Sequence, residues 1–231
     1  MSDDRFLIFI RFAAAPAGQE EAWNRWYDET HIPVRLAMPG FAAARRFEAD
    51  TGDIKHLSLY ELEPLDAITS DIYLENRRRE ASLPEDSFEA QTLKLPGFER
   101  GIYRQVFPDT PYRMPDTEEL FVIGHDIPPG KEDEFYAWYH TEHIPAMLLC
   151  PGFITARHFK MADTLPASSG QQSTSPQYIT IYDLSDKQAL HSEQFLRDQN
   201  SPWSSWIRSW YTKRLRVQAR RVFAGAAPTK D

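Results

Sequence analysis

The chain of 231 residues contains one stretch of sequence twice. Residues 26–47 read WYDETHIPVRLAMPGFAAARRF and residues 138–159 read WYHTEHIPAMLLCPGFITARHF, and 12 of the 22 aligned positions are identical without a gap. A repeat at a fixed offset means that the chain is built from similar structural units. We therefore expect two units, residues 1–110 and residues 111–231, each of the size of a small domain.

Both halves carry the same order of predicted elements. Apolar, β-branched and alternating runs predict strands in the first half over 6–12, 41–47, 56–62 and 100–107, and in the second over 120–125, 153–161, 178–184 and 215–223. Helices are predicted to open after Gly18 and over 65–79, 131–143 and 187–198. Because a proline disfavours helical geometry at the residue before it, Pro33 predicts that the first helix ends near His31.

The order β-α-β-β-α-β describes a split βαβ unit, in which two helices cover one face of a four-stranded antiparallel sheet. The other face of such a sheet is apolar and must be buried. We therefore expect an α+β protein in which two tandem ferredoxin-like units bring their bare sheet faces together as one barrel. The polar segment 162–177 has no counterpart in the first half, and we expect a mobile loop that serves as a lid.

Composition narrows the class of protein. The formal net charge of -8 argues against nonspecific binding to nucleic acid or to an anionic membrane. The single cysteine, Cys150, excludes an intramolecular disulfide and fits a reducing compartment. The first residues resemble neither a signal peptide nor a membrane span. These features predict a cytoplasmic protein, and association into a homodimer is compatible with them.

The repeated Trp-Tyr, His-Ile-Pro and Pro-Gly-Phe elements at 26–41 and 138–153 resemble the dimeric α+β-barrel superfamily, in particular its EthD-like branch. The segment RWYDETHIP (25–33) is also similar to a helix of the bacterial-type chalcone isomerase. The first resemblance implies the barrel fold for most of both halves. The second implies a catalytic role for His31 or for its counterpart His143.

Histidine and tyrosine are the candidate catalytic residues. Trp23, Tyr27 and His31 follow one another at intervals of four, so they share one face of a helix. Imidazole can transfer a proton near neutral pH, and a phenol can orient a substrate oxygen. We expect His31 with Tyr27, or His143 with Tyr139, to act as an acid/base pair; the alternative is that these residues only pack.

The differences between the copies point to the second half. Asp28 is replaced by His140 and Arg46 by His158, and His125 has Ala13 as its aligned counterpart. His125 and His158 are therefore candidate substrate-binding residues. His140 and His143 have a spacing that two metal ligands can share, but the pattern is not that of a known zinc motif, and we expect no metal.

Arginine and tryptophan complete the predicted site. Arg45 and Arg157 recur on the second strand of each half, where one of two neighbouring residues can reach a pocket and bind a carboxylate or phenolate. Trp26 and Trp138 are expected to line the pocket. Trp203, Trp206 and Trp210 are spaced as one helical stripe, for which we expect a place in the core.

These features predict a cofactor-independent acid/base enzyme, an isomerase, cyclase or lyase, that acts on a small hydrophobic molecule of the aromatic or polyketide type. The superfamily resemblance implies an alternative, an oxygen-dependent or haem-linked monooxygenase. A second alternative is a ligand-binding or stress protein without chemistry. The sequence does not choose between the two halves, although the additional histidines favour the second.

Overall fold

The computed structural model describes residues 5–50, 52–110, 114–163, 165 and 174–228. The described residues form two compact units, defined by their internal contacts. The first comprises the described residues of Met1–Arg104, Ala162–Ser175 and Arg221–Asp231, and the second comprises those of Gln105–Met161 and Pro176–Arg220. The sequence-based division at residue 110 differs from these units in three segments, 105–110, 162–175 and 221–231. As a division into folding units it stays a prediction.

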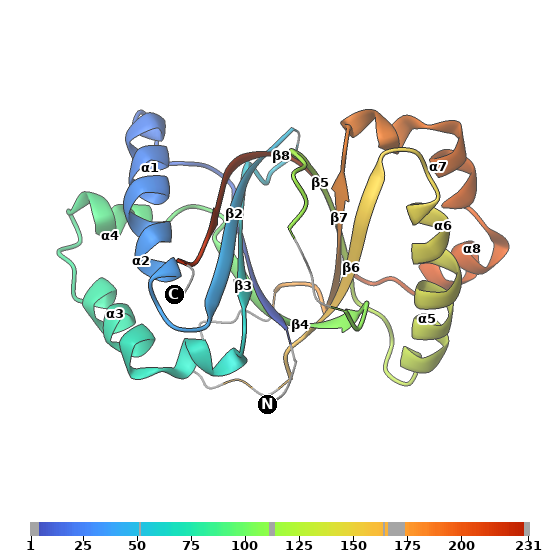
Figure 1. Cartoon of the computed structure of the whole chain (residues 1–231), viewed down its shortest axis with the longest axis horizontal. Helices are drawn as coiled ribbons and strands as arrows, with labels where there is room; N and C mark the ends of the chain where they lie inside the picture. Colours follow the sequence, from blue (N-terminus) through green and yellow to red (C-terminus); the bar gives the residue numbers. More distant parts are fainter. Residues whose placement is uncertain (1–4, 51, 111–113, 164, 166–173, 229–231) are drawn as a thin grey trace. The chain divides into compact units, whose positions relative to one another are not determined.

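The described residues of the first half form four strands and four short α-helices (Figure 1). A 3₁₀ turn at Leu65–Thr69 precedes the third helix. The bounds are β1 (Phe6–Phe12), α1 (Glu20–Trp26), α2 (Ile32–Leu36), β2 (Phe41–Ala49), β3 (His56–Leu62), α3 (Asp71–Ala81), α4 (Phe88–Thr92) and β4 (Glu99–Phe107).

The second half repeats this order. A 3₁₀ turn at Lys187–His191 takes the place of the one in the first half. The bounds are β5 (Glu119–His125), α5 (Glu132–Trp138), α6 (Ile144–Leu148), β6 (Phe153–Met161), β7 (Tyr178–Leu184), α7 (Glu193–Asp198), α8 (Pro202–Arg208) and β8 (Arg214–Ala226). The predicted helices over 65–79 and 187–198 are each divided in two, because Ser70 and Ser192 adopt extended geometry and cap the N-termini of α3 and α7.

Every strand pairs with its neighbours in antiparallel fashion. β1 lies between β3 and β4, and β2 pairs with the other edge of β3; in the second half β5 lies between β7 and β8, and β6 pairs with β7. The full hydrogen-bonded order is β1-β3-β2-β8-β5-β7-β6-β4, a closed barrel. The predicted α+β class and barrel are confirmed. The finer description as tandem ferredoxin-like units stays a prediction.

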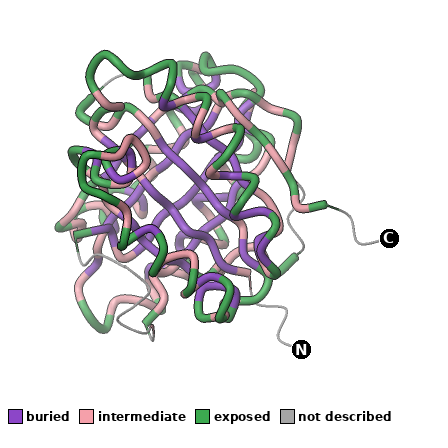
Figure 2. The backbone as a smooth tube through the Cα atoms, turned by 90° about the vertical axis from the view of Figure 1, so that its left-hand side faces the viewer, coloured by how far each residue is buried: buried purple, intermediate pink, exposed green. Residues whose placement is uncertain are grey.

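Each unit builds its core between its helices and one face of its strands. In Figure 1 α5, α6 and α7 lie on the same side of β6 and β7. In Figure 2 the strands that cross the centre of the view are buried, whereas the outer turns of the helices are exposed. Large aromatic side chains fill both cores, with Trp23 and Tyr27 in the first and Phe135, Trp138 and Tyr139 in the second. No helix in the described part of the chain is long and apolar enough to cross a membrane.

The first helix does not end at His31, so that prediction is wrong. A π-helical turn at Tyr27–His31 joins α1 to α2, and a second at Tyr139–His143 joins α5 to α6. In the first of these two π turns the N–H of Ile32 donates to the carbonyl of Tyr27, five residues back. A proline ring clashes with the carbonyl four residues before it in a regular helix. The wider turn relieves that clash, so the chain stays helical through Pro33.

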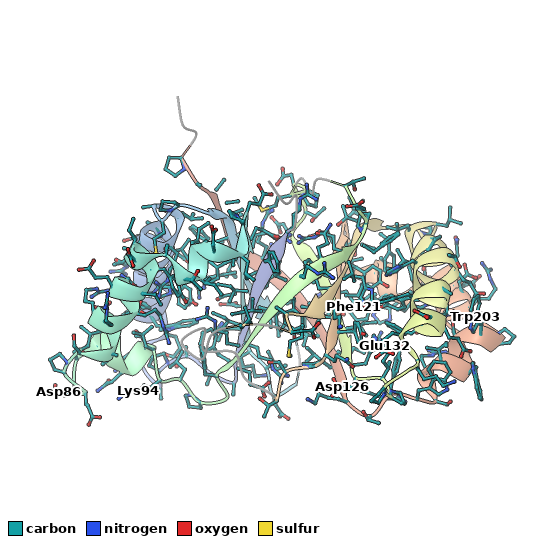
Figure 3. All side chains as sticks on the ribbon, turned by 90° about the horizontal axis from the view of Figure 1, so that it is seen from below. Asp86, Lys94, Phe121, Asp126, Glu132 and Trp203 are labelled. Atoms are coloured by element: carbon teal, nitrogen blue, oxygen red, sulfur yellow. The ribbon has the colours of Figure 1, made fainter. Side chains whose placement is uncertain are left out.

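The expected place of the tryptophan stripe in the core is wrong for Trp206, whereas Trp203 and Trp210 are half-buried and pack against the core of the second unit. Trp206 is 54% exposed, and helix α8 instead buries Ser204 and Ile207. The Trp206 indole N–H donates to Glu134 on α5, at 2.9 Å. Figure 3 shows Trp203 at the outer side of the helices, away from Phe121. Trp206 points away from the buried side chain of Ile207 because neighbouring helical residues point about 100° apart.

The Pro-Gly turn before β6 gives a test of this packing. Gly152 has φ +91°, and a Cβ there would lie 2.6 Å from the Cβ of Ala189; Gly130 has φ +80° with nothing within 4 Å. Gly152→Ala therefore adds a steric clash to the backbone strain that both substitutions share. We expect it to lower the free energy of unfolding by about 3 kcal/mol, against about 1 kcal/mol for Gly130→Ala. Urea unfolding followed by circular dichroism measures both, and equal losses would contradict the packing.

Candidate functional site

The second unit contains a cavity of about 180 Å³ between its helices and strands. Its lining is mostly aromatic and apolar at the sheet and at helix α5, and polar near β8. The lining residues are Phe121, Ile123, Gly124, Trp138, Tyr139, His143, Met147, Tyr182, Phe195, Gln199, Arg208, Tyr211, Arg214, Leu215 and Arg216. The cavity therefore brings together three residues predicted for the site, Trp138, Tyr139 and His143.

The second π turn sets the position of His143. In a π turn the side chain at i+5 lies beside that at i, while the i+4 neighbour remains close. The His143 ring accordingly packs against both preceding aromatic rings, with centroid distances of 4.7 Å to Trp138 and 5.2 Å to Tyr139. The spacing Trp-Tyr-x-x-x-His thus orients one imidazole toward the cavity through two ring contacts.

His143 is a neutral imidazole at physiological pH. It is 7% exposed, and burial followed by the nearby Arg208 guanidinium lowers the pKa of His143 to about 3. Its Nδ1 makes no hydrogen bond within the described residues. A neutral ring with a free nitrogen at a cavity wall can accept a proton from a bound molecule.

Tyr139 is held in place by the sheet. Its hydroxyl lies 2.6 Å from the Thr180 hydroxyl on β7, where either oxygen can be the donor. Burial raises the pKa of Tyr139 to about 12, an effect that the hydrogen bond with Thr180 opposes. The phenol therefore stays protonated at neutral pH and can donate a hydrogen bond.

His125 lies behind Tyr139 and does not line the cavity. It is fully buried and stacks on Tyr211 with a centroid distance of 4.1 Å. Neither ring nitrogen makes a hydrogen bond within the described residues, and burial lowers the pKa of His125 to about 3. Its role in substrate binding stays a prediction.

The aligned counterpart of His125 was expected to be Ala13, and this is wrong. His125 pairs across the sheet with Tyr178, whereas Phe12 pairs with His56, the residue equivalent to Tyr178. Phe12 is therefore the structural counterpart of His125. The register differs by one residue because the loop between strand and helix, 126–131, is one residue shorter than 13–19 in the first half.

His140 and His158 form a pair. His140 Nε2 lies 2.8 Å from His158 Nδ1, with the proton on one of the two nitrogens. The equivalent residues of the first unit, Asp28 and Arg46, form an ion pair between the same positions. Two substitutions that look independent in the sequence are therefore one replacement, in which a neutral histidine pair takes the place of an ion pair. His158 lies behind Tyr139 at 4.7 Å between ring centroids and does not line the cavity.

The first unit keeps the same π turn around a smaller space. The His31 ring lies 4.9 Å from the rings of both Trp26 and Tyr27. His31 and Tyr27 line a cavity of only about 70 Å³. Burial, followed by the nearby Arg35, lowers the pKa of His31 well below its ordinary value. Such a volume holds only a few water molecules.

The two predicted arginines lie elsewhere. Strand neighbours alternate between faces, and Arg46 and His158 take the helix-facing positions. Arg45 and Arg157 therefore project from the opposite face of their strands, where each guanidinium packs over the phenylalanine two residues later. Neither lines the two cavities described above.

The sequence analysis missed the arginines that do line the larger cavity, Arg208, Arg214 and Arg216. A signal for two of them is present in the segment RLRV at 214–217, where arginine alternates with buried apolar residues. This alternation places Arg214 and Arg216 on one face of β8.

The described residues of the site fit neither a metal ion nor haem. Within the described residues no three His, Cys, Asp or Glu side chains are grouped so as to hold a metal ion. A cavity of about 150 Å³ accommodates one benzene ring, whereas haem contains four pyrrole rings. The cavity beside His143, at about 180 Å³, therefore does not fit haem.

Solved structures with the same fold were found, although no protein-family model and no curated protein match the chain. An anthrone oxidase-like protein is 11% identical with a TM-score of 0.62, covering 99% of this chain and 95% of the other. A putative monooxygenase from Fusobacterium nucleatum is 8% identical with a TM-score of 0.59, covering 98% and 96%. A putative chlorite dismutase is 15% identical with a TM-score of 0.59, covering 96% of each chain.

These neighbours are members of the dimeric α+β-barrel superfamily, and the likeness shows that this chain has the same kind of fold. The identities are too low to show more than the fold. The EthD-like branch and the relation to chalcone isomerase stay predictions.

The buried His125 predicts a pH dependence of stability. The unfolded side chain has a pKa near 6.5, so it binds a proton as the pH falls while the folded ring stays neutral. The unfolded chain then holds more protons, and stability is lost as the pH falls from about 6.5 toward 3. We expect His125→Phe, which copies Phe12, to reduce the loss of unfolding free energy between pH 7.5 and pH 4.5 by about 3 kcal/mol.

Urea unfolding at the two pH values measures this difference. His191→Phe, on an exposed histidine, is the matched control and should leave the wild-type pH dependence unchanged. If His125→Phe loses as much stability in acid as the wild type, then His125 is protonated in the folded chain and the prediction is wrong.

Proposed function

We propose that the cavity of the second unit binds a small phenolic aromatic compound, and that the chain oxidises it with molecular oxygen as a cofactor-independent monooxygenase. The observation that carries this proposal is a neutral imidazole, His143, at the wall of a largely aromatic cavity. The same residues serve the acid/base chemistry expected from the sequence, and oxygen enters as the second substrate.

The volume of the cavity limits the size of the substrate. A cavity of about 150 Å³ holds one benzene ring, so about 180 Å³ accommodates a single substituted ring. Trp138, Phe121 and Phe195 provide faces and edges for contact with such a ring. A larger polycyclic substrate would have to extend beyond the cavity.

The chemistry begins with a proton transfer. His143 accepts the phenolic proton, which leaves an electron-rich phenolate that molecular oxygen can oxidise at a ring carbon. In the net reaction the ring C–H and the O–H lose two hydrogens, one oxygen atom leaves with them as water, and the other becomes a quinone carbonyl. The substrate supplies all the electrons, so no separate reductant is required.

Tyr139 assists by orienting the substrate. Its protonated hydroxyl, fixed by Thr180, can donate a hydrogen bond to the substrate oxygen as negative charge develops there. The apolar walls exclude water, which strengthens this interaction and favours the uncharged oxygen molecule. The phenolate that the transfer produces stabilises the imidazolium beside it, which offsets part of the cost of protonating the buried His143 ring.

The names of the structural neighbours support an oxygen-dependent enzyme. They include an anthrone oxidase-like protein and putative monooxygenases from Fusobacterium nucleatum and Lactobacillus acidophilus. At identities of 8 to 11% this support rests on the shared fold and on the chemistry of the cavity together.

An isomerase or lyase of small aromatic compounds is the second candidate. The observation that favours it is the same pair, His143 and Tyr139, which can remove a proton and return it elsewhere without any oxidant. Dependence on oxygen separates the two functions.

The test is oxygen uptake with a panel of single-ring phenols and hydroquinones, measured with an oxygen electrode. We expect the wild type to consume one oxygen molecule per molecule of product. His143→Ala should lower kcat by roughly 10²- to 10⁴-fold because it removes the base, and Tyr139→Phe should lower it by about tenfold.

The exposed His191→Ala is the control and should retain wild-type activity. Product formation that continues unchanged under nitrogen would exclude the monooxygenase and favour the isomerase. Full activity of His143→Ala with loss in His31→Ala would place the reaction in the first unit instead.

A further inference from the structure

Three arginines line one side of the cavity in the second unit, Arg208, Arg214 and Arg216, and no Asp or Glu lines it. Guanidinium groups remain charged in proteins, so the described wall of the cavity carries three positive charges. The chain as a whole carries a formal net charge of -8. The local excess of positive charge is therefore opposite to the balance of the whole protein.

The fold brings these arginines to one place from two elements. On β8, Arg214 lies opposite His125 and Arg216 lies opposite Ile123, so both project from the helix-facing side of the sheet. Residues two apart on a strand are separated by about 7 Å. Arg208 comes from the end of α8, and its backbone carbonyl accepts a hydrogen bond from Arg214 at 3.3 Å.

None of the three arginines is in an ion pair within the described residues. Arg208 donates to the Ser204 carbonyl and to the Asn200 side chain, which are both neutral acceptors. The Arg216 guanidinium lies 4.5 Å from the centroid of the Phe121 ring, which itself lines the cavity. No described carboxylate of the unit therefore neutralises the positive charge on this side of the cavity.

The rest of the lining is largely apolar and aromatic. It includes Trp138, Met147 and Phe195, and His143 is present with an Nδ1 that makes no hydrogen bond within the described residues. A ligand that fits this lining is a planar aromatic ring with an anionic group at one end. Guanidinium groups bind carboxylates through paired N–H donors, which gives both affinity and orientation.

We propose that the substrate of this cavity is an aromatic carboxylate of the hydroxybenzoate type, whose carboxylate binds Arg208, Arg214 and Arg216 while its ring packs between Trp138 and Phe121. The inference rests on the proposed function in taking this cavity as the substrate site. It adds the class of substrate and the three residues that select it. The carboxylate at the arginines directs the far end of the ring toward His143.

The test compares three ligands of the same size and shape that differ only in charge: benzoate, benzamide and benzamidinium. Binding is measured by isothermal titration calorimetry, with quenching of Trp138 fluorescence as a second readout. We expect benzoate to bind at least tenfold more tightly than benzamide and benzamidinium to bind least. The preference should weaken as salt is raised from 20 mM to 500 mM, because the arginines lie partly in solvent.

Arg208→Gln and Arg216→Gln should each reduce the benzoate preference by about three- to tenfold, and Arg216→Lys should retain part of it. Arg216→Glu should shift the preference from benzoate toward benzamidinium. The matched control is Arg220→Gln on the same strand, where the arginine pairs with Glu118 outside the cavity. Circular dichroism confirms that each variant is folded.

Equal affinity of the wild type for benzoate and benzamide, or a preference that survives both glutamine substitutions, would overturn the inference. The proposed function fails by a different result. If benzoate binds selectively but hydroxybenzoates cause no oxygen uptake, the carboxylate site stands and the monooxygenase does not. If neutral phenols are oxidised in a manner that requires His143, with no preference for carboxylates, the monooxygenase stands and the carboxylate site does not.

Discussion

The wider backbone turn at Tyr139–His143 is the constraint on which the site depends. It lets Pro145 stay within a continuous helix, and it places His143 against two aromatic rings at once. The first unit has the same turn at Tyr27–His31 with the same ring contacts. Four of the twelve identical positions in the repeat, Trp26, Tyr27, His31 and Pro33 with their counterparts, therefore belong to this one backbone turn. The shared histidine follows from the geometry of the turn and does not by itself indicate catalysis.

The two units differ in the charge of the side chains buried between their helices and their strands. In the first unit Arg46 is buried and pairs with Asp28, while the Arg46 guanidinium packs over Trp23 and Tyr27. In the second, His140 and His158 keep a hydrogen bond between the same positions without charge. A buried ion pair needs both partners, since one charge alone is costly in the interior. Both positions differ together between the units, and the second unit has a neutral polar pair behind Tyr139.

The lining of the cavity in the second unit is neutral in one part and positively charged in another. Residues of the π turn and of the strands supply the neutral part, and α8 and β8 supply the three arginines. Expulsion of water by the aromatic walls makes the arginine and tyrosine donors more effective toward a bound anion. In the first unit Arg35 is instead paired with Glu80 in a buried bridge of 2.6 Å, and the remaining volume is small. Volume and charge together, more than the histidine, favour the second unit as the functional one.

The sequence alone determined the repeat, the strands and the α+β barrel, because apolar alternation and a gapless duplication depend only on local pattern. It also predicted that His143, Tyr139 and Trp138 lie together, as they do in the cavity lining, since their spacing along the chain is local. It could not join His140 to His158 or align His125 with Phe12, since each depends on how a strand pairs with or packs against another element. It could not bring Arg208 beside Arg214 either, since that contact depends on the path of the loop between α8 and β8. It placed Arg157 toward a pocket and Trp206 in the core, whereas the tertiary structure decided which face of each element is covered. The spacing of residues along the chain is enough to bring the rings and the imidazole together on one helix, but tertiary packing determines which other residues they contact.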